Sequence, residues 1–211
     1  MALKGRRTGL GITAEGDMLA ALGLRYGSDE AIDFAVSVHR TLAVEAYRAS
    51  VKMAQERGAF PLYDTAREKG NPMVERLREA DPELCAEMEK YGRRNIAMLT
   101  IAPTGTTSLM SQTTSGIEPV FRPVYKRRRK INPSDKDKTP DFIDNMGEKF
   151  EEYYVYHHQF VKWAEKSGFN TSNLEKISDE ELDKMLKASP YYGATANDID
   201  WVAKVRMQGA I

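Results

Sequence analysis

One turn in this 211-residue sequence gathers residues whose types could do chemistry: Thr104–Ser108, which reads Thr-Gly-Thr-Thr-Ser. It follows a short apolar run, Ile96–Ala102, that Pro103 closes, and it leads into Leu109 and Met110, where we expect a helix to begin. The length and β-branched residues of the run predict a buried strand. A strand, a tight turn and a helix start expose backbone N–H groups at the positive end of a helix dipole, and such a concavity binds phosphate.

The same turn has a plainer interpretation. Threonine and serine residues after a strand cap the next helix in many ordinary turns. Neither the P-loop lysine nor the three-glycine spacing of the Rossmann fingerprint is present. The residue types alone therefore leave two alternatives open, phosphate binding and helix capping.

Helices are expected to surround this turn. Thr13 is predicted to cap a helix over about Glu15–Leu24, and Ser28 begins a long helix that ends at Gly58. Small and apolar residues mark one face of the long helix at spacings of three and four, which makes it a central packing element. The members of that face are Ala31, Ala35, Val38, Leu42, Ala46, Ala49 and Met53.

Two short helices, about 72–79 and 82–91, are predicted where a proline follows an Asn or Asp cap. Cys85 lies inside the second, and its acidic neighbours are expected to raise the pKa of its thiol, which makes it a poor nucleophile. Later helices are predicted from His157 to Gly168, over 179–188 behind a capping box at Ser178, and after Asn197–Asp200. No metal site is expected, because the histidines lack partners at helical spacing.

A basic run, Lys126–Lys130, could contact a nucleic acid or another anion. Acidic residues follow it, however, and a strand with solvated long side chains is the favoured interpretation. Phe142 and Ile143 precede a turn at Asn145–Gly147, and a second β-like segment follows, so residues 141–156 are predicted to form a hairpin.

Composition limits the function classes. Lys+Arg and Asp+Glu are both 31, so no global field favours nucleic acid or a membrane, and a nucleic-acid partner is not expected. A single cysteine excludes a disulfide framework and suits a reducing compartment. The N-terminus has no apolar leader, and no run reaches the ~18 apolar residues of a transmembrane helix. A cytoplasmic location is predicted.

Several motifs together resemble a ribonucleotide reductase large chain, most closely the class II, adenosylcobalamin-dependent type. The most specific block is Leu99–Leu109, reading LTIAPTGTTSL, followed at close spacing by Ser115–Phe121, reading SGIEPVF. The flanks are similar as well, so the resemblance spans essentially the whole chain. These flanks are Arg6–Gly11, Asp17–Leu19, Leu24–Ser28, Ile131–Asp137 and Lys204–Ile211.

The resemblance implies a helix-dominated α/β fold: part of the ten-stranded α/β barrel of such an enzyme, toward the C-terminal part of the barrel. It implies one barrel fragment over residues 1–211 with a hairpin insertion at about 131–156. It also implies radical reduction of ribonucleotides to 2′-deoxyribonucleotides. In the family the turn holds substrate phosphates, a role that falls here on Pro103, Thr104, Gly105, Thr106 and Thr107.

Glu118 and Pro119 belong to the companion motif and are assigned to the wall of the substrate pocket. The family needs a thiyl-forming cysteine and a reducing cysteine pair, whereas this chain has only Cys85. No catalytic residue is therefore expected here, and the isolated chain is predicted to be inactive and to bind no cofactor. Adenosylcobalamin would serve the complete enzyme.

Two functional hypotheses follow. In the first, the chain binds a ribonucleoside diphosphate or triphosphate and works with the remaining portion of the reductase. In the second, it is a non-catalytic anion-binding or assembly module that uses Lys126–Lys130. Under either, strands beside Ile96–Ala102 are missing, so exposed apolar surface and self-association through it are expected.

Overall fold

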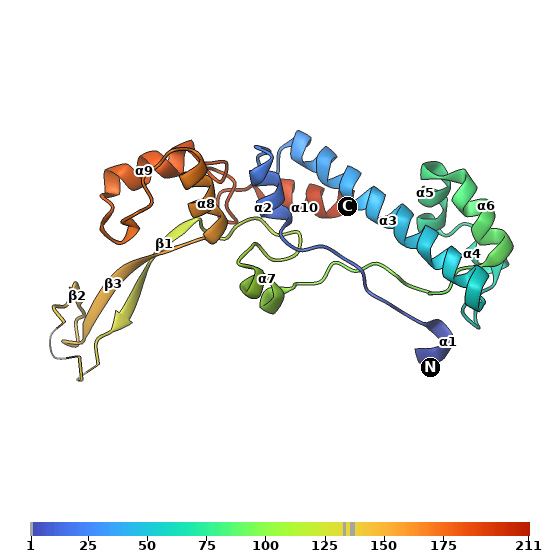
Figure 1. The fold of residues 1–211 in the computed structure, drawn as a ribbon, viewed down its shortest axis with the longest axis horizontal. Coiled ribbons are helices and arrows are strands. Elements are labelled where there is room, and N and C mark those ends of the chain that lie inside the picture. The colour runs from blue at the N-terminus through green and yellow to red at the C-terminus, as the bar shows by residue number, and fades with distance from the viewer. Residues whose placement is uncertain (1, 133, 136–137) are drawn as a thin grey trace. The chain divides into compact units, whose positions relative to one another are not determined.

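The computed structural model describes residues 2–132, 134–135 and 138–211 (Figure 1), which divide into two compact units. Unit 1 comprises the chain up to Thr13, Gly27–Thr104 and Trp201–Ile211, and unit 2 comprises Ala14–Tyr26 and Gly105–Asp200. Each unit is described by itself. The described structure is helix-dominated, with a small antiparallel sheet that does not close into a barrel.

Unit 1 is built on one long helix. Its helices are α1 (Ala2–Gly5), α3 (Asp29–Arg57), α4 (Thr65–Glu68), α5 (Pro72–Ala80), α6 (Pro82–Tyr91) and α10 (Trp201–Ala210). The predicted span of α3 is confirmed: the Ser28 hydroxyl accepts a hydrogen bond from the Ala31 N–H at 3.2 Å, and Gly58, at φ 79°, ends the helix. Helices α5, α6 and α10 all pack against α3, which confirms its central role.

The predicted apolar face of α3 is right only in its first half. Ala31 and Ala35 are buried, but Ala49 and Met53 are exposed, and Tyr47 and Val51 enter the core instead. The buried Ser50 lies on this second face. A prediction based on the spacing of apolar residues does not include a serine. The main core of unit 1 consists of Tyr47, Val51, Val74, Leu77, Leu84, Cys85, Met88 and Met98.

The caps of α5 and α6 follow the prediction. The Asn71 side chain accepts from the Met73 N–H at 3.0 Å, and the Asp81 side chain accepts from the Leu84 N–H at 2.9 Å. Proline occupies the first position of each helix, where its missing N–H costs nothing.

The predicted strand Ile96–Ala102 is wrong. The segment is extended, but among the described residues it forms a single β-bridge, a parallel one between Leu10 and Leu99. The N–H groups of Thr8 and Leu10 donate to Ala97 O and Met98 O, and no other strand of the described residues pairs with it. With a partner on one side only, Met98 is buried while Ile101 stays 46% exposed.

Unit 2 combines the sheet with helices. Its elements are α2 (Glu15–Ala21), α7 (Gly105–Ser111), β1 (Val124–Lys130), β2 (Phe142–Ile143), β3 (Lys149–Tyr156), α8 (His158–Lys166), a 3₁₀ turn η1 (Leu174–Lys176) and α9 (Asp179–Ala188). The strand order is β1-β3-β2, and all pairs are antiparallel. The predicted hairpin is confirmed, with Phe142 opposite Phe150, and β1 adds a third strand to it.

Two helix starts in unit 2 differ from expectation. The residue that precedes α2 is Ala14, at φ 69°, and it makes no side-chain cap, so Thr13 does not cap this helix. Helix α7 begins at Gly105, four residues earlier than predicted, so the hydroxylated residues form its first turn. At α9 the predicted capping box is present, with Ser178 and Glu181 bonded reciprocally.

The core of unit 2 joins α2, α8 and α9 through six buried side chains: Ala20, Val120, Phe160, Ala164, Met185 and Tyr191. Apolar side chains also remain in solvent. Leu109 and Met110 on α7 are 80% and 83% exposed, and Trp201 on α10 is 72% exposed. Among the described residues, no helix combines the length and apolarity needed to cross a bilayer.

Candidate functional site

Gly105, the glycine of the predicted phosphate turn, begins α7 and is exposed. A Cβ built on Gly105 would meet no heavy atom within 4 Å. Gly105, Thr106 and Thr107 are all exposed. The first N–H groups of a helix have no partner within the helix, and here they lie in an exposed turn beside two hydroxyl groups. Helix starts bind anions in many proteins, and phosphate binding at this turn stays a prediction.

The residue before the helix is conformationally strained. Thr104 has φ 49°, in the left-handed region that a β-branched residue rarely enters, at a cost of about 1–3 kcal/mol. Its Oγ1 lies 2.9 Å from Oγ1 of Thr13, a contact that holds the side chain within unit 1. Pro103, the preceding residue, is exposed. The predicted turn therefore divides between the units: Pro103 and Thr104 belong to unit 1, and Gly105–Thr107 to unit 2.

Ser108 is the fourth residue of α7 and its buried one. It is 5% exposed, and its hydroxyl donates to the Gly105 carbonyl at 2.8 Å. The same Oγ lies 2.8 Å from Oγ of Ser115, the first residue of the companion motif. The sequence interpretation assigned no role to either serine. A signal was available, because a helical serine three residues after Gly105 can reach back to its carbonyl.

The companion motif packs on α2. The N–H of Glu118 donates to Ser115 O at 2.9 Å, and the Glu118 side chain is exposed while Pro119 is half-buried. The approach to α2 is close, because a Cβ on Gly16 would lie 2.6 Å from the Glu118 carbonyl oxygen. Glu118 and Pro119 thus share unit 2 with Gly105–Thr107, and their role as a pocket wall stays a prediction.

A buried carboxylate fixes the chain just before this motif. Asp17 of α2 is 7% exposed, and its Oδ2 accepts from the Thr114 N–H at 2.8 Å. Its Oδ1 lies 2.7 Å from His157 Nε2 and accepts from the Tyr191 hydroxyl at 2.9 Å. Burial raises the pKa of Tyr191, and the neighbouring Asp17 raises it further. The sequence interpretation missed this cluster because its members lie up to 174 positions apart.

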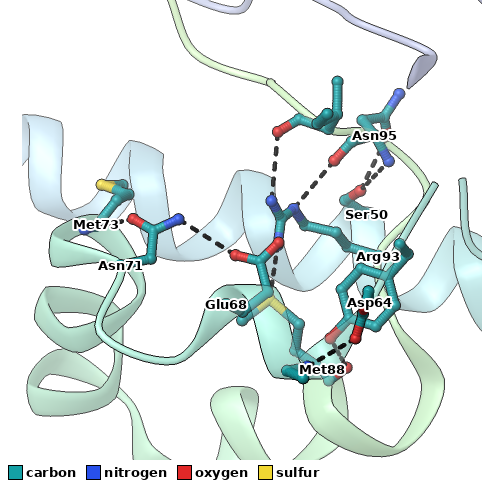
Figure 2. Close-up of polar contacts among 11 residues, drawn as sticks. Ser50, Asp64, Glu68, Asn71, Met73, Met88, Arg93 and Asn95 are labelled. Atoms are coloured by element: carbon teal, nitrogen blue, oxygen red, sulfur yellow. Dashed lines mark hydrogen bonds and ion pairs between the residues drawn. The ribbon is translucent and has the colours of Figure 1, made fainter.

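In unit 1, the segment that leads to Pro103 is anchored by a buried arginine (Figure 2). The side chain of Arg93 is 5% exposed, and one guanidinium nitrogen lies 2.9 Å from Glu68 Oε1. The same group donates to the carbonyls of Asn95 at 3.1 Å and Ile96 at 3.4 Å. Its Cζ also lies 5.6–5.8 Å from three ring centroids, those of Tyr47, Phe60 and Tyr63.

Asn95 continues this anchor toward the N-terminal segment. Its side-chain oxygen accepts from the Ser50 hydroxyl at 2.9 Å, and its side-chain nitrogen donates to Arg6 O at 2.8 Å. Figure 2 shows Asn95 and Arg93 meeting above α3. Arg93 and Asn95 therefore hold the start of the extended segment against α3 and α4, which compensates for its missing strand partners.

Cys85, unlike the exposed turn at Gly105, lies in the hydrophobic core of unit 1. It is fully buried in the core of unit 1, with its Sγ 3.8 Å from Val74 O. Burial raises the pKa of its thiol, and nearby Glu89 raises it further against the opposing effect of Arg78. The predicted direction is confirmed, although burial rather than acidic neighbours is the main cause. Among the described residues, no group of three His, Cys, Asp or Glu side chains could hold a metal ion.

The basic run forms β1, as predicted, and acids on β3 and at Glu148, just before it, neutralise most of the run. Arg128 binds Glu152 at 2.6 Å, Lys130 binds Glu148 at 2.5 Å, and Arg129 pairs with Glu151. The Arg128 guanidinium also lies 3.8 Å from the centroid of the Phe142 ring. In the part of the chain that the structure describes, Arg127 is the member of the run without a carboxylate partner in an ion pair.

Comparison with known proteins gives consistent similarities. Residues 2–211 match the family described as the ribonucleotide reductase barrel domain. The chain is 37% identical over 122 residues to the vitamin B12-dependent ribonucleoside-diphosphate reductase of Mycobacterium tuberculosis, covering 58% of this chain and 15% of that protein. It is 30% identical over 206 residues to the protein of the same name from Thermoplasma acidophilum, covering 96% of this chain and 22% of that protein.

A ribonucleoside-diphosphate reductase subunit alpha, from Treponema pallidum, is 29% identical over 133 residues, covering 59% of this chain and 15% of that protein. The chain thus spans 15–22% of the length of these three relatives. The family match extends over nearly every residue, including the turn at Gly105 and both units. The chain belongs to the ribonucleotide reductase barrel domain family.

Proposed function

We propose that this chain supplies the substrate-phosphate-binding loop of a ribonucleotide reductase that reduces ribonucleotides to 2′-deoxyribonucleotides by radical chemistry. The loop is Pro103, Thr104, Gly105, Thr106 and Thr107. The observation that carries the proposal is the exposed first turn of α7, where a Cβ added to Gly105 would meet no heavy atom within 4 Å beyond the adjoining residues and the helix backbone. Free N–H groups in such a turn suit the oxygens of a phosphate.

The ligand is a ribonucleoside diphosphate or triphosphate, and the diphosphate is favoured because the relatives are named ribonucleoside-diphosphate reductases. Glu118 and Pro119 are proposed to shape the adjoining pocket wall. The strained Thr104 supports a functional role for the loop, because backbone strain of this kind, here a φ of 49°, is concentrated at functional sites.

The complete enzyme is proposed to be of class II and to use adenosylcobalamin, because two relatives are named vitamin B12-dependent. The thiol of this chain does not fit that cofactor's chemistry. Cys85 is sealed in the core with a raised thiol pKa, so no radical step is assigned to it. The chain alone is therefore proposed to be inactive and to require the remaining portion of the reductase, in the cytoplasm.

Phosphate-dependent binding tests the proposal. We expect cytidine diphosphate to shift the amide resonances of Gly105, Thr106 and Thr107 in an NMR titration, while cytidine leaves them unchanged. No deoxynucleotide should form until the remaining reductase chain is added together with adenosylcobalamin and a dithiol. Equal shifts with cytidine and its diphosphate would refute phosphate recognition at this turn.

The alternative, an anion-binding module on the basic run, makes a separate prediction. If the nucleotide binds at the turn, Arg128→Ala should change nucleotide affinity less than about twofold, because Arg128 is already held by Glu152 and Phe142. Isothermal titration calorimetry with cytidine diphosphate measures this change. Arg127→Ala is the companion test, because among the described residues Arg127 is the member of the run without a carboxylate partner. A tenfold loss in either variant would favour the strand β1 surface over the turn.

A further inference from the structure

We propose that the open edge of β1, the side of this strand away from β3, is a docking site for an extended acidic segment of a partner protein. That segment would add to the sheet as a further strand. Among the described residues β1 pairs with β3 alone, and six of its seven residues, Tyr125–Lys130, are exposed. This inference does not rest on the proposed function, because it concerns the sheet and not the turn at Gly105.

The register shows which backbone groups of β1 face the open edge. Just beyond the strand, the Ile131 N–H donates to Lys149 O at 2.8 Å, so this pair is hydrogen-bonded. Hydrogen-bonded and non-hydrogen-bonded pairs alternate along an antiparallel ladder, so the odd-numbered residues of β1 bond to β3. The N–H and C=O groups of Lys126, Arg128 and Lys130 therefore point to the open edge. Within the described part of the chain, these groups have no hydrogen-bond partner.

The charge around β1 favours an acidic partner. The described residues place six cations here, Lys138 and those of Lys126–Lys130, but their ion pairs involve only three carboxylates, those of Glu148, Glu151 and Glu152. The cations therefore outnumber the acids, and this surface keeps a positive charge. The cations are also the more accessible partners: the Arg128 side chain is 53% exposed, whereas that of Glu152 is 18% exposed. An approaching carboxylate would meet cations first.

A second copy of this chain does not fit the open edge. Pairing β1 with β1 of another copy would set cations opposite cations along residues 126–130, and like charges directly opposite each other destabilise a sheet. Charged side chains on edge strands prevent this kind of self-association in natural proteins.

A nucleic acid fits the charge of the edge but not its hydrogen-bonding groups. Phosphate oxygens accept hydrogen bonds and cannot donate to the C=O groups of Lys126, Arg128 and Lys130. An extended peptide offers an N–H and a C=O at each residue, so it can satisfy the donors and the acceptors of the edge together. Acidic side chains on that peptide add the opposite charge. The edge therefore selects an acidic peptide over a polyanion that lacks donors.

The test uses the full reductase chain that contains this segment and a labelled probe as long as β1, acetyl-Glu-Thr-Glu-Thr-Glu-Thr-Glu-amide. Fluorescence anisotropy measures its dissociation constant. We expect Arg128→Ala to weaken binding about threefold, because an exposed cation is lost. Arg128→Pro should weaken it about tenfold further, because proline also removes the N–H at the open edge. The ladder to β3 does not use this N–H, so Arg128→Ala and Arg128→Pro form a matched pair.

Hydrogen exchange locates the bound probe. Saturation with the probe should slow exchange of the N–H groups of Lys126, Arg128 and Lys130. The N–H groups of Arg127 and Arg129 should change little, because they already bond to β3. Slowing confined to residues outside β1 would overturn the proposal.

A methylated probe separates strand pairing from charge attraction. Methylation of every backbone nitrogen keeps the charge of the probe but removes its donors, and we expect this probe not to bind. Equal binding of both probes, or equal affinities of Arg128→Pro and Arg128→Ala, would refute strand addition. Failure of the unmethylated probe to bind, or tighter binding of a single-stranded DNA heptamer, would refute an acidic peptide as the occupant. If thermal unfolding shows that Arg128→Pro does not fold, the methylated probe decides the question alone.

Discussion

Gly105→Val is expected to abolish the phosphate-dependent part of nucleotide binding and to leave the fold intact. The protein has room for the new side chain, because a Cβ at this position would meet no heavy atom within 4 Å beyond the adjoining residues and the helix backbone. The ligand would be excluded, because the branched valine side chain would occupy the space in which we propose that the phosphate binds. Loss of two charge-assisted hydrogen bonds, about 3 kcal/mol, corresponds to a roughly 100-fold weaker affinity.

The measurement is the dissociation constant for cytidine diphosphate, with thermal unfolding as the test of folding. Gly209→Val is the matched control, since a Cβ there also meets nothing within 4 Å and the position lies in α10. We expect the control to bind normally. A Gly105→Val protein that binds the diphosphate as the unsubstituted protein does would exclude the turn as the phosphate site.

Arg93→Ala is expected to destabilise unit 1 by about 3–5 kcal/mol, the usual cost of removing one partner of a buried ion pair. Glu68, 14% exposed, would keep a charge without its 2.9 Å partner. The carbonyls of Asn95 and Ile96 would lose their donor, and three aromatic rings would lose the cation packed against them. Urea unfolding followed by tyrosine fluorescence or circular dichroism measures the change.

Arg78→Ala is the appropriate comparison, because Arg78 and Glu89 form an ion pair at 2.8 Å whose side chains are 41% and 49% exposed. Its loss should cost less than about 1 kcal/mol. Arg93→Lys should recover only part of the loss, because an ammonium cannot reach Glu68 and two carbonyls together. If Arg93→Ala and Arg78→Ala proved equally mild, the buried network would not be a structural anchor.

Local signals in the sequence were sufficient for the helices. Ser28, Asn71, Asp81 and Ser178 each cap the helix predicted after them, because a cap depends on residues within a few positions. The hairpin was predictable for the same reason, since Asp144 and Gly147 form a local turn. These elements need no knowledge of distant partners.

Long-range partners explain what was missed. A strand needs a neighbour that pairs with it over several residues, and among the described residues the run at Ile96 forms only a single bridge, from Leu99 to Leu10. The ion pair of Arg93 with Glu68 joins residues 25 positions apart, across helices whose packing no local pattern encodes. The phosphate role of the turn was predicted from its residue types and stays a prediction, whereas the contact of the buried Ser108 with Ser115 had no local signal.

The single cysteine, Cys85, allows the opening of unit 1 to be measured by thiol labelling. Because Cys85 is fully buried and its thiol pKa is raised, a maleimide or disulfide reagent can reach the thiolate only when α5 and α6 separate from α3. The labelling rate then equals the equilibrium constant for opening multiplied by the intrinsic reaction rate, as in amide hydrogen exchange. The rate at which Cys85 is labelled therefore measures how often the core of unit 1 opens.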